Sequence, residues 1–513
     1  MIRHLKLVLV ISTSICLLVQ SKTVNKDRNT PRPFPKGFLF GTSTASYQTE
    51  GGWNLDGKSE NIWDHLTHTN PCSVKDCSNG DIANDSYHLY KRDVEMMREL
   101  GLHFYRFSLS WTRILSSSFP NKINDAGVQY YNNLIDEMLK YNIEPMVTLY
   151  HWDLPQQLQL LGGWTNPHVV DWFADYARVA FELFGDRVKY WVTVNEPRQI
   201  CYQGYGAATM APLIAIPGIA EYMCAKNLLV AHAKAYHIYD KEFRDKGAGV
   251  IGISISADWI EPETPKDTQA AFEALQFEWG QYAHPIFSEA GDFPPVMKER
   301  IAAKSAEQGF PRSRLPEFSK KEIEMLRGSS DFFGLNHYST NILYKNASTQ
   351  GIFEKPSFYD DIGAATYQRP EWPTSASFWL KSVPWGFYKL LRFISDEYNN
   401  PPVIITENGW STLTGIEDDG RVAYYRDYLD AMLDAIEDGC EVIAYTAWSL
   451  MDNFEWMQGY TERFGLYEVD YNSPQRTRTP RKSAFVYKQI IRTNQLDYDY
   501  VPDTNEMTID EGH

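Results

Sequence analysis

The sequence predicts an α/β protein built as a single (β/α)8 barrel, also called a TIM barrel. Eight short runs rich in β-branched and aromatic residues recur along nearly the whole chain, and segments with helical periodicity separate them. After residue 21 there is no apolar run of about 18 residues, no low-complexity linker and no internal repeat. Alternating strands and helices give a parallel sheet, and eight such units close it into one continuous barrel.

The eight predicted strands end in polar or aromatic residues. The carboxyl ends of barrel strands lie on one face, where such a fold carries its functional site. We therefore expect the residues that follow the strands to surround one pocket. The predicted strands span Phe38 to Ala45, Phe104 to Trp111, Pro145 to Tyr150, Tyr190 to Val194, Val250 to Ser256, Phe332 to Tyr338, Val403 to Thr406 and Val442 to Ser449.

Two of the intervening segments have a clear helical pattern. After Asp125, apolar residues recur at three- and four-residue spacing as far as Leu139. Asn166 and Pro167 predict the N-cap and first turn of another helix, and Gly185 predicts its end. Both segments lie between consecutive predicted strands, as the barrel requires.

The N-terminus has the pattern of a secretory signal peptide. A short basic region precedes an apolar run from Leu7 to Val19, and a cleavage site fits after Ser21. The run is too short, and too rich in Ser and Thr, for a membrane span. We therefore expect a secreted, extracellular protein, with a signal peptide at residues 1–21, the barrel domain at 22–496 and an acidic C-terminal tail at 497–513.

The composition argues against several classes of partner. The formal net charge is −17 at pH 7, and loss of the basic signal region makes the mature chain more negative. A nucleic-acid partner is not expected, because phosphate binding needs a basic surface. The sequence has neither a Gly-rich phosphate-binding loop nor Cys or His at metal-ligand spacing, so no NAD, ATP, zinc or other cofactor is expected.

The five cysteines outside the signal peptide fall into two groups. Cys72 and Cys77 bracket a short polar loop, and we expect them to form a disulfide in an oxidising compartment. Cys201, Cys224 and Cys440 have no metal-like spacing, and we expect them to behave as small buried hydrophobic residues.

Two Asn-x-Ser sequons, at Asn84 and Asn346, are candidate glycosylation sites. They suit a secreted glycoprotein. Such triplets also arise often by chance.

Two of the predicted strands are followed by a glutamate. Glu407 comes directly after the run from Val403 to Thr406, and Glu196 follows Asn195 after the run from Tyr190 to Val194. Either residue alone is more often a structural or helix-capping carboxylate. A carboxylate at the end of a buried strand is costly to desolvate. Together the two predict a pair of carboxylates that face each other across a pocket.

The other strand ends carry groups suited to a neutral polyol. Hydroxyl groups need hydrogen-bond donors and acceptors, and the apolar face of a sugar ring stacks on an indole. The strand ends supply Gln48, Arg106, His151, Trp152, Asn195, Asn336, Tyr338, Trp448, Glu455 and Trp456.

Seven motifs in order along the chain make it resemble glycoside hydrolase family 1, the β-glucosidases and their relatives, and most of all the secreted arthropod members. The resemblance implies a (β/α)8 barrel, no cofactor and a small-molecule β-glycoside or oligosaccharide as substrate. The motifs are Phe38 to Gln48, Tyr105 to Ile114, Thr193 to Pro197, Asp331 to Tyr338, Ile405 to Gly409, Ala447 to Trp456 and Gly459 to Tyr467.

The resemblance implies a role for each catalytic carboxylate. Glu407 corresponds to the nucleophile and Glu196 to the acid/base of a retaining glycosidase, in which the two carboxyl groups lie roughly 5 Å apart. Arg106, Tyr338 and Asn336 correspond to residues that hold the nucleophile ionised and oriented. A structural ion pair for Arg106 and a core position for Tyr338 are the alternatives.

The resemblance also implies the substrate-binding set. Trp448 would stack beneath the sugar ring, and Trp379 would shape the leaving-group side, although it could equally be a core residue. His151 in isolation would more often be a core histidine. The expected hydrogen-bonding residues are Gln48, His151, Asn195, Glu455 and Trp456.

Two positions in the last motifs indicate an unphosphorylated sugar. Members of the family that act on 6-phosphoglycosides carry Ser where Trp456 stands and Lys where Glu462 stands. An indole and a carboxylate would exclude and repel a phosphate.

The leading hypothesis is a secreted retaining β-glycosidase that releases terminal β-D-glucosyl residues, with β-D-galactosyl and β-D-fucosyl substrates and a homodimer left open. The nearest rival is a thioglucosidase, in which Arg198 would contact the sulfate of a glucosinolate. The alternative for Arg198 is a solvent-facing ion pair. Plant thioglucosidases carry Gln in place of Glu196, which argues against that version alone. A catalytically inactive sugar-binding protein would lack one of the two glutamates, and both are present.

Overall fold

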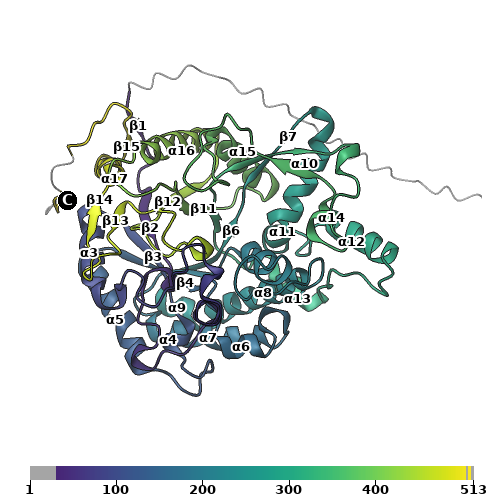
Figure 1. Ribbon diagram of the computed structural model, residues 1–513, viewed down its shortest axis with the longest axis horizontal. Helices are drawn as coiled ribbons and strands as arrows, with labels where there is room; N and C mark the ends of the chain where they lie inside the picture. Colours follow the sequence, from purple (N-terminus) through teal and green to yellow (C-terminus); the bar gives the residue numbers. More distant parts are fainter. Residues whose placement is uncertain (1–29, 504–506, 510–513) are drawn as a thin grey trace, which may run out of the picture.

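The computed structural model describes residues 30–503 and 507–509. Eight parallel strands form a closed barrel, which confirms the predicted fold (Figure 1). Around the barrel the order is β11-β12-β2-β3-β4-β5-β6-β8, so barrel strands that follow each other in the chain are neighbours. They are β2 (Leu39–Ser43), β3 (Phe104–Ser108), β4 (Glu144–Tyr150), β5 (Tyr190–Asn195), β6 (Val250–Ser256), β8 (Phe333–Asn336), β11 (Val403–Asn408) and β12 (Val442–Trp448).

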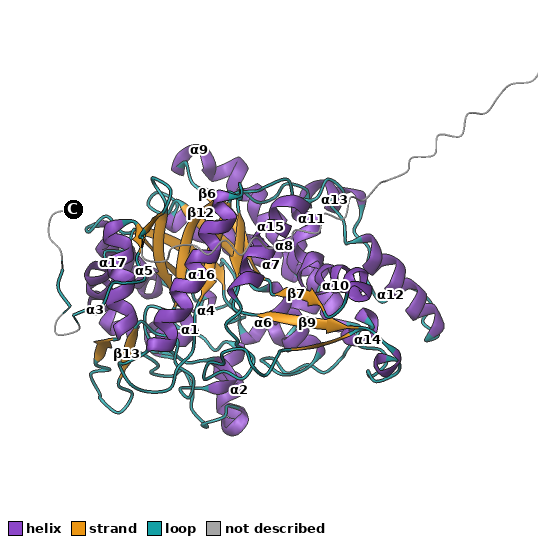
Figure 2. Ribbon diagram, turned by 90° about the horizontal axis from the view of Figure 1, so that it is seen from above, coloured by secondary structure: helices purple, strands orange, loops and turns teal. Residues whose placement is uncertain are grey.

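Helices follow each barrel strand and cover the outside of the barrel (Figures 1 and 2). Each turns its apolar stripe toward the strands; α7, for example, buries Phe173, Ala177, Ala180 and Phe184. The main helices are α3 (Ser86–Leu100), α5 (Asp125–Leu139), α7 (Val169–Phe184), α8 (Ala220–Ile238), α10 (Thr268–Leu275), α11 (Gln281–Phe287), α12 (Pro295–Glu307), α13 (Lys320–Leu326), α15 (Pro384–Glu397), α16 (Asp419–Glu437) and α17 (Lys482–Thr493).

Several predicted boundaries differ from those in the structure. The first, second and sixth strands are shorter than predicted, whereas the seventh extends to Asn408, so that Glu407 belongs to the strand itself. Helix α7 begins at Val169 rather than Pro167, because Pro167 and His168 form a turn in which Asn166 accepts a backbone hydrogen bond from Val169 at 3.0 Å. Gly185 is the C-cap, as predicted.

Two smaller sheets extend the barrel. Strands β7 (Trp259–Pro262), β9 (Thr340–Tyr344) and β10 (Ala365–Tyr367) form a three-stranded sheet beside α10 and α14 (Phe358–Ile362) (Figure 2). Strands β13 (Tyr467–Val469) and β14 (Arg478–Pro480) form a hairpin-like pair in the segment that follows the last barrel strand.

An apolar layer fills the amino-terminal end of the barrel. Phe104, Met146, Val192, Ile404 and Ala444 come from five different strands and form a buried cluster with Phe332. Further along the same strands the inward-facing residues become polar and charged, from Arg106 onward. The packed layer closes one end of the barrel and leaves the carboxyl ends of the strands for chemistry.

The described residues contain two disulfides. Cys72 and Cys77 are bonded, as predicted. Cys201 and Cys224 are also bonded, so the prediction that they are simply small buried hydrophobic residues is wrong. Two helical segments pack together and bring their Cα atoms to 5.4 Å, although 23 residues separate them in sequence. Cys440 is a free, buried cysteine, as predicted.

The two sequons differ in accessibility. Asn84 is fully buried; its amide donates to the carbonyl of Asp452 at 2.6 Å and accepts from Tyr471 at 3.0 Å. The folded chain therefore cannot carry a glycan on Asn84, and that candidate is wrong. Asn346 lies exposed on a loop, and its glycosylation stays a prediction.

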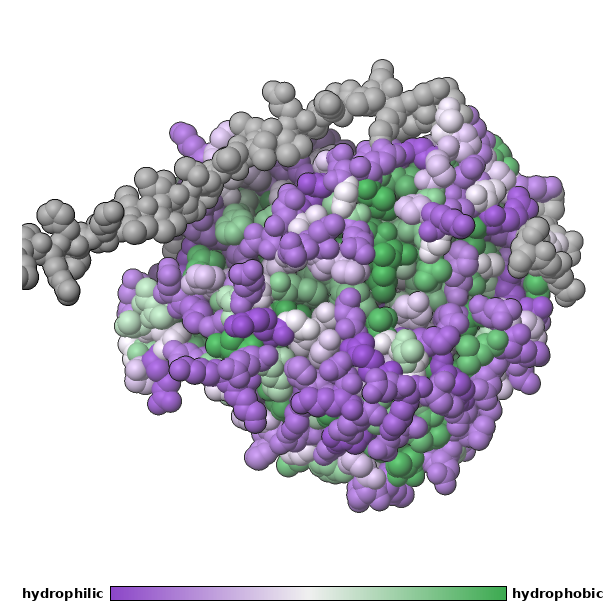
Figure 3. Space-filling view, turned by 180° about the vertical axis from the view of Figure 1, so that it is seen from behind, coloured by the Kyte–Doolittle hydropathy of each residue, from purple (hydrophilic) through white to green (hydrophobic). Residues whose placement is uncertain are grey.

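The predicted signal peptide, residues 1–21, lies outside the described residues. The described part of the predicted tail packs against the barrel: Tyr498 donates to Asp427 at 3.1 Å, and Arg426 donates to the carbonyl of Tyr500 at 2.6 Å. Within the described part of the chain, none of the helices combines the length and hydrophobicity needed to cross a membrane. The face in Figure 3 is mostly hydrophilic, with hydrophobic residues interspersed.

Candidate active site

A cavity of about 570 Å³ opens at the carboxyl ends of the barrel strands. It brings together most of the residues predicted from the sequence, although they come from strands and loops spread over 250 residues and more. Gln48, Arg106 and Asn336 do not line it directly but support its walls. The predicted residues that line it are His151, Trp152, Asn195, Glu196, Arg198, Tyr338, Trp379, Glu407, Trp448, Glu455, Trp456 and Glu462.

Glu407 projects from β11 and is held by two donors. One oxygen accepts a hydrogen bond from the guanidinium of Arg106 at 2.8 Å, and the other accepts from the hydroxyl of Tyr338 at 2.8 Å. Arg106 is itself fully buried, and it also donates to the carbonyl of Thr406 and to Asn195. These contacts fix the orientation of Glu407 and favour its ionised form.

Glu196 follows β5 directly and has a different environment. Its carboxylate accepts one hydrogen bond from the side-chain amide of Asn336, at 2.8 Å, and makes no ion pair among the described residues. Its backbone has φ +52°, a left-handed conformation that is uncommon for a residue with a side chain. Asn336 also interacts with Glu407, so this one amide lies between the two carboxyl groups.

The pKa values of the two carboxyl groups differ for physical reasons. Burial raises the pKa of Glu196 to about 8, and the negative charge of Glu407 contributes to the increase. Burial also raises the pKa of Glu407, but Arg106, Tyr338 and Asn336 oppose that increase. As the pH rises, Glu407 therefore loses its proton first and Glu196 stays protonated. A neutral acid beside an ionised carboxylate is the pair that glycosidic cleavage needs.

Asn195 connects Arg106, which holds Glu407, to His151, one of the predicted sugar-binding residues. Its side-chain oxygen accepts from Arg106 at 2.6 Å and from Asn336 at 3.0 Å, and its amide contacts Nε2 of His151 at 3.0 Å. Because that amide donates, Nε2 of His151 accepts and the proton of the neutral ring lies on Nδ1. Burial, and then Arg106, hold the pKa of His151 well below its usual value.

Among the predicted substrate-binding residues, three buried polar atoms have no hydrogen-bond partner within the described part of the chain. They are Nδ1 of His151, a donor, and the acceptors Oε1 of Gln48 and Oε2 of Glu455. The amide nitrogen of Gln48 is held by Asn453 at 2.9 Å, which fixes the direction of its oxygen. Burial without a partner is costly, so these atoms are ready to bind the hydroxyl groups of a ligand.

Aromatic rings surround these polar atoms. His151 stacks against Trp448 and Trp456, with ring centroids 5.9 and 5.8 Å away. Both indoles line the cavity and are almost fully buried. An apolar surface beside converging polar groups matches the two-sided character of a sugar ring.

The outer part of the cavity is more exposed. Trp379 is 38% exposed and contacts Tyr338 edge to face, at 5.7 Å, so it is a cavity residue rather than a core residue. Arg198 forms a short ion pair with Glu278 and lies 4.9 Å from the ring of Tyr202. Arg198 is therefore an ion-pair residue, but the pair is largely buried in the cavity wall rather than solvent-facing as that alternative expected.

Sequence reasoning missed most of this outer wall. Its residues lie in loops and irregular helices, which neither a helical periodicity nor a strand end identifies in the sequence. Phe378 is the exception, because it precedes Trp379 in a motif that was recognised. The missed residues are Gln199, Tyr202, Gln203, Thr209, Met210, Asp258, Tyr359 and Phe378. Within residues 30–503 and 507–509, no group of three or more His, Cys, Asp or Glu side chains could hold a metal ion.

Comparison with known proteins identifies the family. The model of glycosyl hydrolase family 1 matches residues 30–496. Myrosinase 1 of Brevicoryne brassicae is 48% identical over 90% of this chain and 99% of that protein, and the cytosolic β-glucosidase of Homo sapiens is 42% identical over the same shares. Among solved structures, aphid myrosinase matches with a TM-score of 0.85 at 47% identity, over 90% of this chain and 99% of its own. A rice β-glucosidase, Os3BGlu6, matches with a TM-score of 0.83 at 38% identity, over 89% and 98%. The chain belongs to glycosyl hydrolase family 1 and is a retaining glycoside hydrolase.

Proposed function

We propose that the protein is a β-glucosidase that removes terminal β-D-glucosyl residues, with Glu407 as the nucleophile and Glu196 as the acid/base. The observation that carries the proposal is the asymmetry between the two carboxyl groups. Glu407 accepts from a buried guanidinium and a phenol, whereas Glu196 accepts from one amide. The first environment favours a carboxylate and the second a protonated acid.

In the first step, an oxygen of Glu407 bonds to the anomeric carbon while the bond to the leaving-group oxygen breaks. Glu196 donates its proton to that oxygen. In the second step, Glu196 accepts a proton from water, and the water oxygen displaces Glu407 from the anomeric carbon. Two inversions give net retention, and both glutamates return to their starting protonation states. A glutamate-to-glutamine variant of the rice relative in a covalent complex with Glc supports such an intermediate.

The pH dependence follows from the pKa of Glu196. We expect kcat/KM for an aryl β-glucoside to fall as the pH rises through about 8, because Glu196 is then deprotonated in the free enzyme. On the acid side, activity falls as Glu407 becomes protonated. Rates measured from pH 4 to 10 check this. Glu196→Gln has no proton to lose, so it should remove the alkaline limb for the same aryl β-glucoside while lowering the rate itself. An alkaline limb that persists in this variant would contradict the assignment.

Two residues support an unphosphorylated sugar. Trp456 and Glu462 both line the cavity. Burial, and then the neighbouring carboxyl groups of Glu462, Glu407 and Glu196, raise the pKa of Glu455 well above its usual value. A phosphate placed there would meet several carboxyl groups, which would repel it.

The leaving-group side supports a neutral aglycone. Its wall is aromatic, and its one guanidinium, on Arg198, is already paired with Glu278 and lies near the carboxyl group of Asp258. A sulfate there would have to compete with a buried ion pair. The likeness to aphid myrosinase favours a second candidate function, that of a thioglucosidase.

A small substrate panel tests the proposal. We expect kcat/KM to be highest for an aryl β-glucoside, lower for the matched β-galactoside and β-fucoside, and lower still for a glucosinolate. Glu278→Gln should raise the ratio of glucosinolate to aryl glucoside hydrolysis, roughly tenfold, because it releases the charge of Arg198. A wild-type enzyme that prefers the glucosinolate would make the thioglucosidase the correct function.

We further propose that the protein is secreted. Two disulfides and the predicted signal peptide support this. Protein recovered from the medium of expressing cells should begin near Lys22 on N-terminal sequencing. Protein that stays in the cytosol and begins at Met1 would contradict it.

A further inference from the structure

The two disulfides are tied to different walls of the cavity. We propose that Cys72–Cys77 fixes the turn that binds the glycone, and that Cys201–Cys224 fixes the cavity wall that contacts the leaving group. Cys72–Cys77 then affects specificity for the glycone, and Cys201–Cys224 affects specificity for the leaving group, each independently of the other. The assignment of the two sides rests on the proposed β-glucosidase function, in which the deeply buried end of the cavity takes the glucosyl group.

The loop closed by Cys72–Cys77 is bonded to the turn that carries Glu455 and Trp456. The backbone N–H of Lys75 donates to the carbonyl of Met457 at 2.9 Å, and Asp76 accepts from the backbone N–H of Tyr460 at 2.8 Å. Both contacts involve residues inside the disulfide ring.

The same two segments approach closely at Gly459. A Cβ there would lie 2.0 Å from a carboxylate oxygen of Asp76, so Asp76 would have to leave its position, and the φ of +58° also disfavours a side chain. The turn itself closes through a hydrogen bond of 2.7 Å from the N–H of Glu455 to the carbonyl of Gly459. A change in the shape of the disulfide loop is therefore passed to Glu455 and Trp456.

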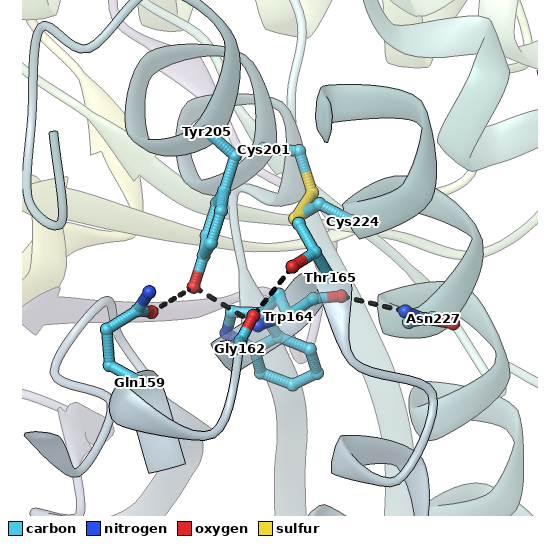
Figure 4. The surroundings of a disulfide bond; sticks show 8 residues. All are labelled: Gln159, Gly162, Trp164, Thr165, Cys201, Tyr205, Cys224 and Asn227. Carbon is cyan, nitrogen blue, oxygen red and sulfur yellow. Dashed lines mark hydrogen bonds between the residues drawn. A yellow bond between two sulfur atoms is a disulfide. The ribbon is translucent and has the colours of Figure 1, made fainter. Parts of the chain in front are cut away.

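Cys201–Cys224 connects the segment behind the acid/base to α8 (Figure 4). Cys201 lies in the π-helix η4 (Gln199–Gly206), whose first residue donates a backbone hydrogen bond of 3.0 Å to the carbonyl of Glu196. η4 supplies Gln199, Tyr202 and Gln203 to the outer part of the cavity. Helices with π geometry are rare and short, and they occur frequently at functional sites.

A polar network around this disulfide joins three segments (Figure 4). The hydroxyl of Tyr205, on η4, accepts from the N–H of Trp164 at 3.1 Å, and Asn227, on α8, donates to the carbonyl of Trp164 at 2.9 Å. The disulfide adds a covalent link directly from η4 to α8. It therefore fixes the helix that follows Glu196 against one of the longest helices of the barrel.

The two disulfides differ in accessibility, which permits a test without mutation. Cys72 and Cys77 are exposed, whereas Cys201 and Cys224 are completely buried. A mild, water-soluble phosphine applied to the native enzyme should reduce Cys72–Cys77 to two thiols, with oxidation of the phosphine to its oxide. It should leave Cys201–Cys224 intact, because the phosphine must reach a sulfur atom to attack it. Alkylation and peptide mapping report which bond has opened.

The experiment compares ratios of kcat/KM, which do not depend on the fraction of active enzyme. One ratio compares an aryl β-glucoside with the matched β-galactoside and so reports on the glycone. The other compares two aryl β-glucosides whose leaving groups differ in size and so reports on the leaving-group side. The enzymes are the wild type, the pair Cys72→Ser with Cys77→Ser, and the pair Cys201→Ala with Cys224→Ala.

We expect each variant to move one ratio only. Opening Cys72–Cys77, by substitution or by reduction, should change the glycone ratio roughly tenfold and leave the leaving-group ratio unchanged. Opening Cys201–Cys224 should do the reverse. Each pair is the matched control for the other.

Two results would overturn the inference. Both variants could move the same ratio, or both could lower thermal stability with neither ratio changed. If the buried pair fails to fold as Ala/Ala, the volume-matched Cys201→Val with Cys224→Ala replaces it, and selective reduction tests the exposed bond in any case. A wild-type enzyme that hydrolyses none of the glycosides would instead contradict the proposed function. Failure of the proposed function and failure of this inference therefore give different results.

Discussion

Glu407→Ala is expected to lose about 10⁵- to 10⁶-fold in kcat for every glycoside, whatever its leaving group. The variant cannot form the glycosyl-enzyme, because it lacks the carboxylate that Arg106 and Tyr338 hold ready to attack. A good leaving group does not help, since the missing group is the one that attacks. Rates with dinitrophenyl β-glucoside and with cellobiose measure this loss.

The matched control for this prediction is Glu407→Gln. Removal of Glu407 leaves the buried guanidinium of Arg106 without its charged partner, and breaking a buried pair costs about 3–5 kcal/mol. The oxygen of Gln can still accept from Arg106 or Tyr338, so the glutamine variant should be the more stable of the two yet equally inactive. Activity that survives in Glu407→Gln would show that the carboxylate is not the nucleophile.

Glu196→Ala is expected to affect substrates unequally. For cellobiose, whose leaving group needs a proton, kcat/KM should fall by roughly a hundred- to ten-thousand-fold. With dinitrophenyl β-glucoside the variant should still form the glycosyl-enzyme and then stall, because no general base activates water. Pre-steady-state kinetics should show a burst of dinitrophenol followed by slow turnover.

The control for this second prediction is the wild type with the same two substrates. Its ratio of kcat/KM for the dinitrophenyl glucoside over cellobiose should be much smaller than that of Glu196→Ala. Equal losses for both substrates would exclude an acid/base role for Glu196, although the chain would remain a member of its family.

The barrel and the centre of the site could be predicted from the sequence. β-Branched runs such as Val403 to Thr406 must be buried on both faces, so their order specifies a parallel sheet. The closed barrel then brings Glu196 and Glu407 to one end although more than 200 residues separate them in sequence. The local sequence pattern is sufficient to predict the site here, because every residue at the carboxyl end of a barrel strand lies on the same face of the barrel.

Other features depend on packing between distant segments and leave no local signal. Cys201 and Cys224 bond because η4 and α8 lie side by side, which their spacing does not reveal. The sequon at Asn84 suggests an exposed loop. In the fold, Asn84 is buried and donates a hydrogen bond to the carbonyl of Asp452, which is far along the chain. Arg198 is an ion-pair residue because Glu278 reaches it from the π-helical segment η7 (Gln276–Gly280), 80 residues further along the chain.

The most direct test of the central claim is the configuration of the product formed with azide. Azide replaces water in Glu196→Ala and attacks the glycosyl-enzyme, so NMR should show the β-glucosyl azide. In Glu407→Ala, azide can only displace the leaving group directly from the opposite face, so any product should be the α azide. β azide from Glu196→Ala with α azide from Glu407→Ala is the predicted result. The same anomer from both variants, or α azide from Glu196→Ala, would contradict the assigned roles of the two glutamates.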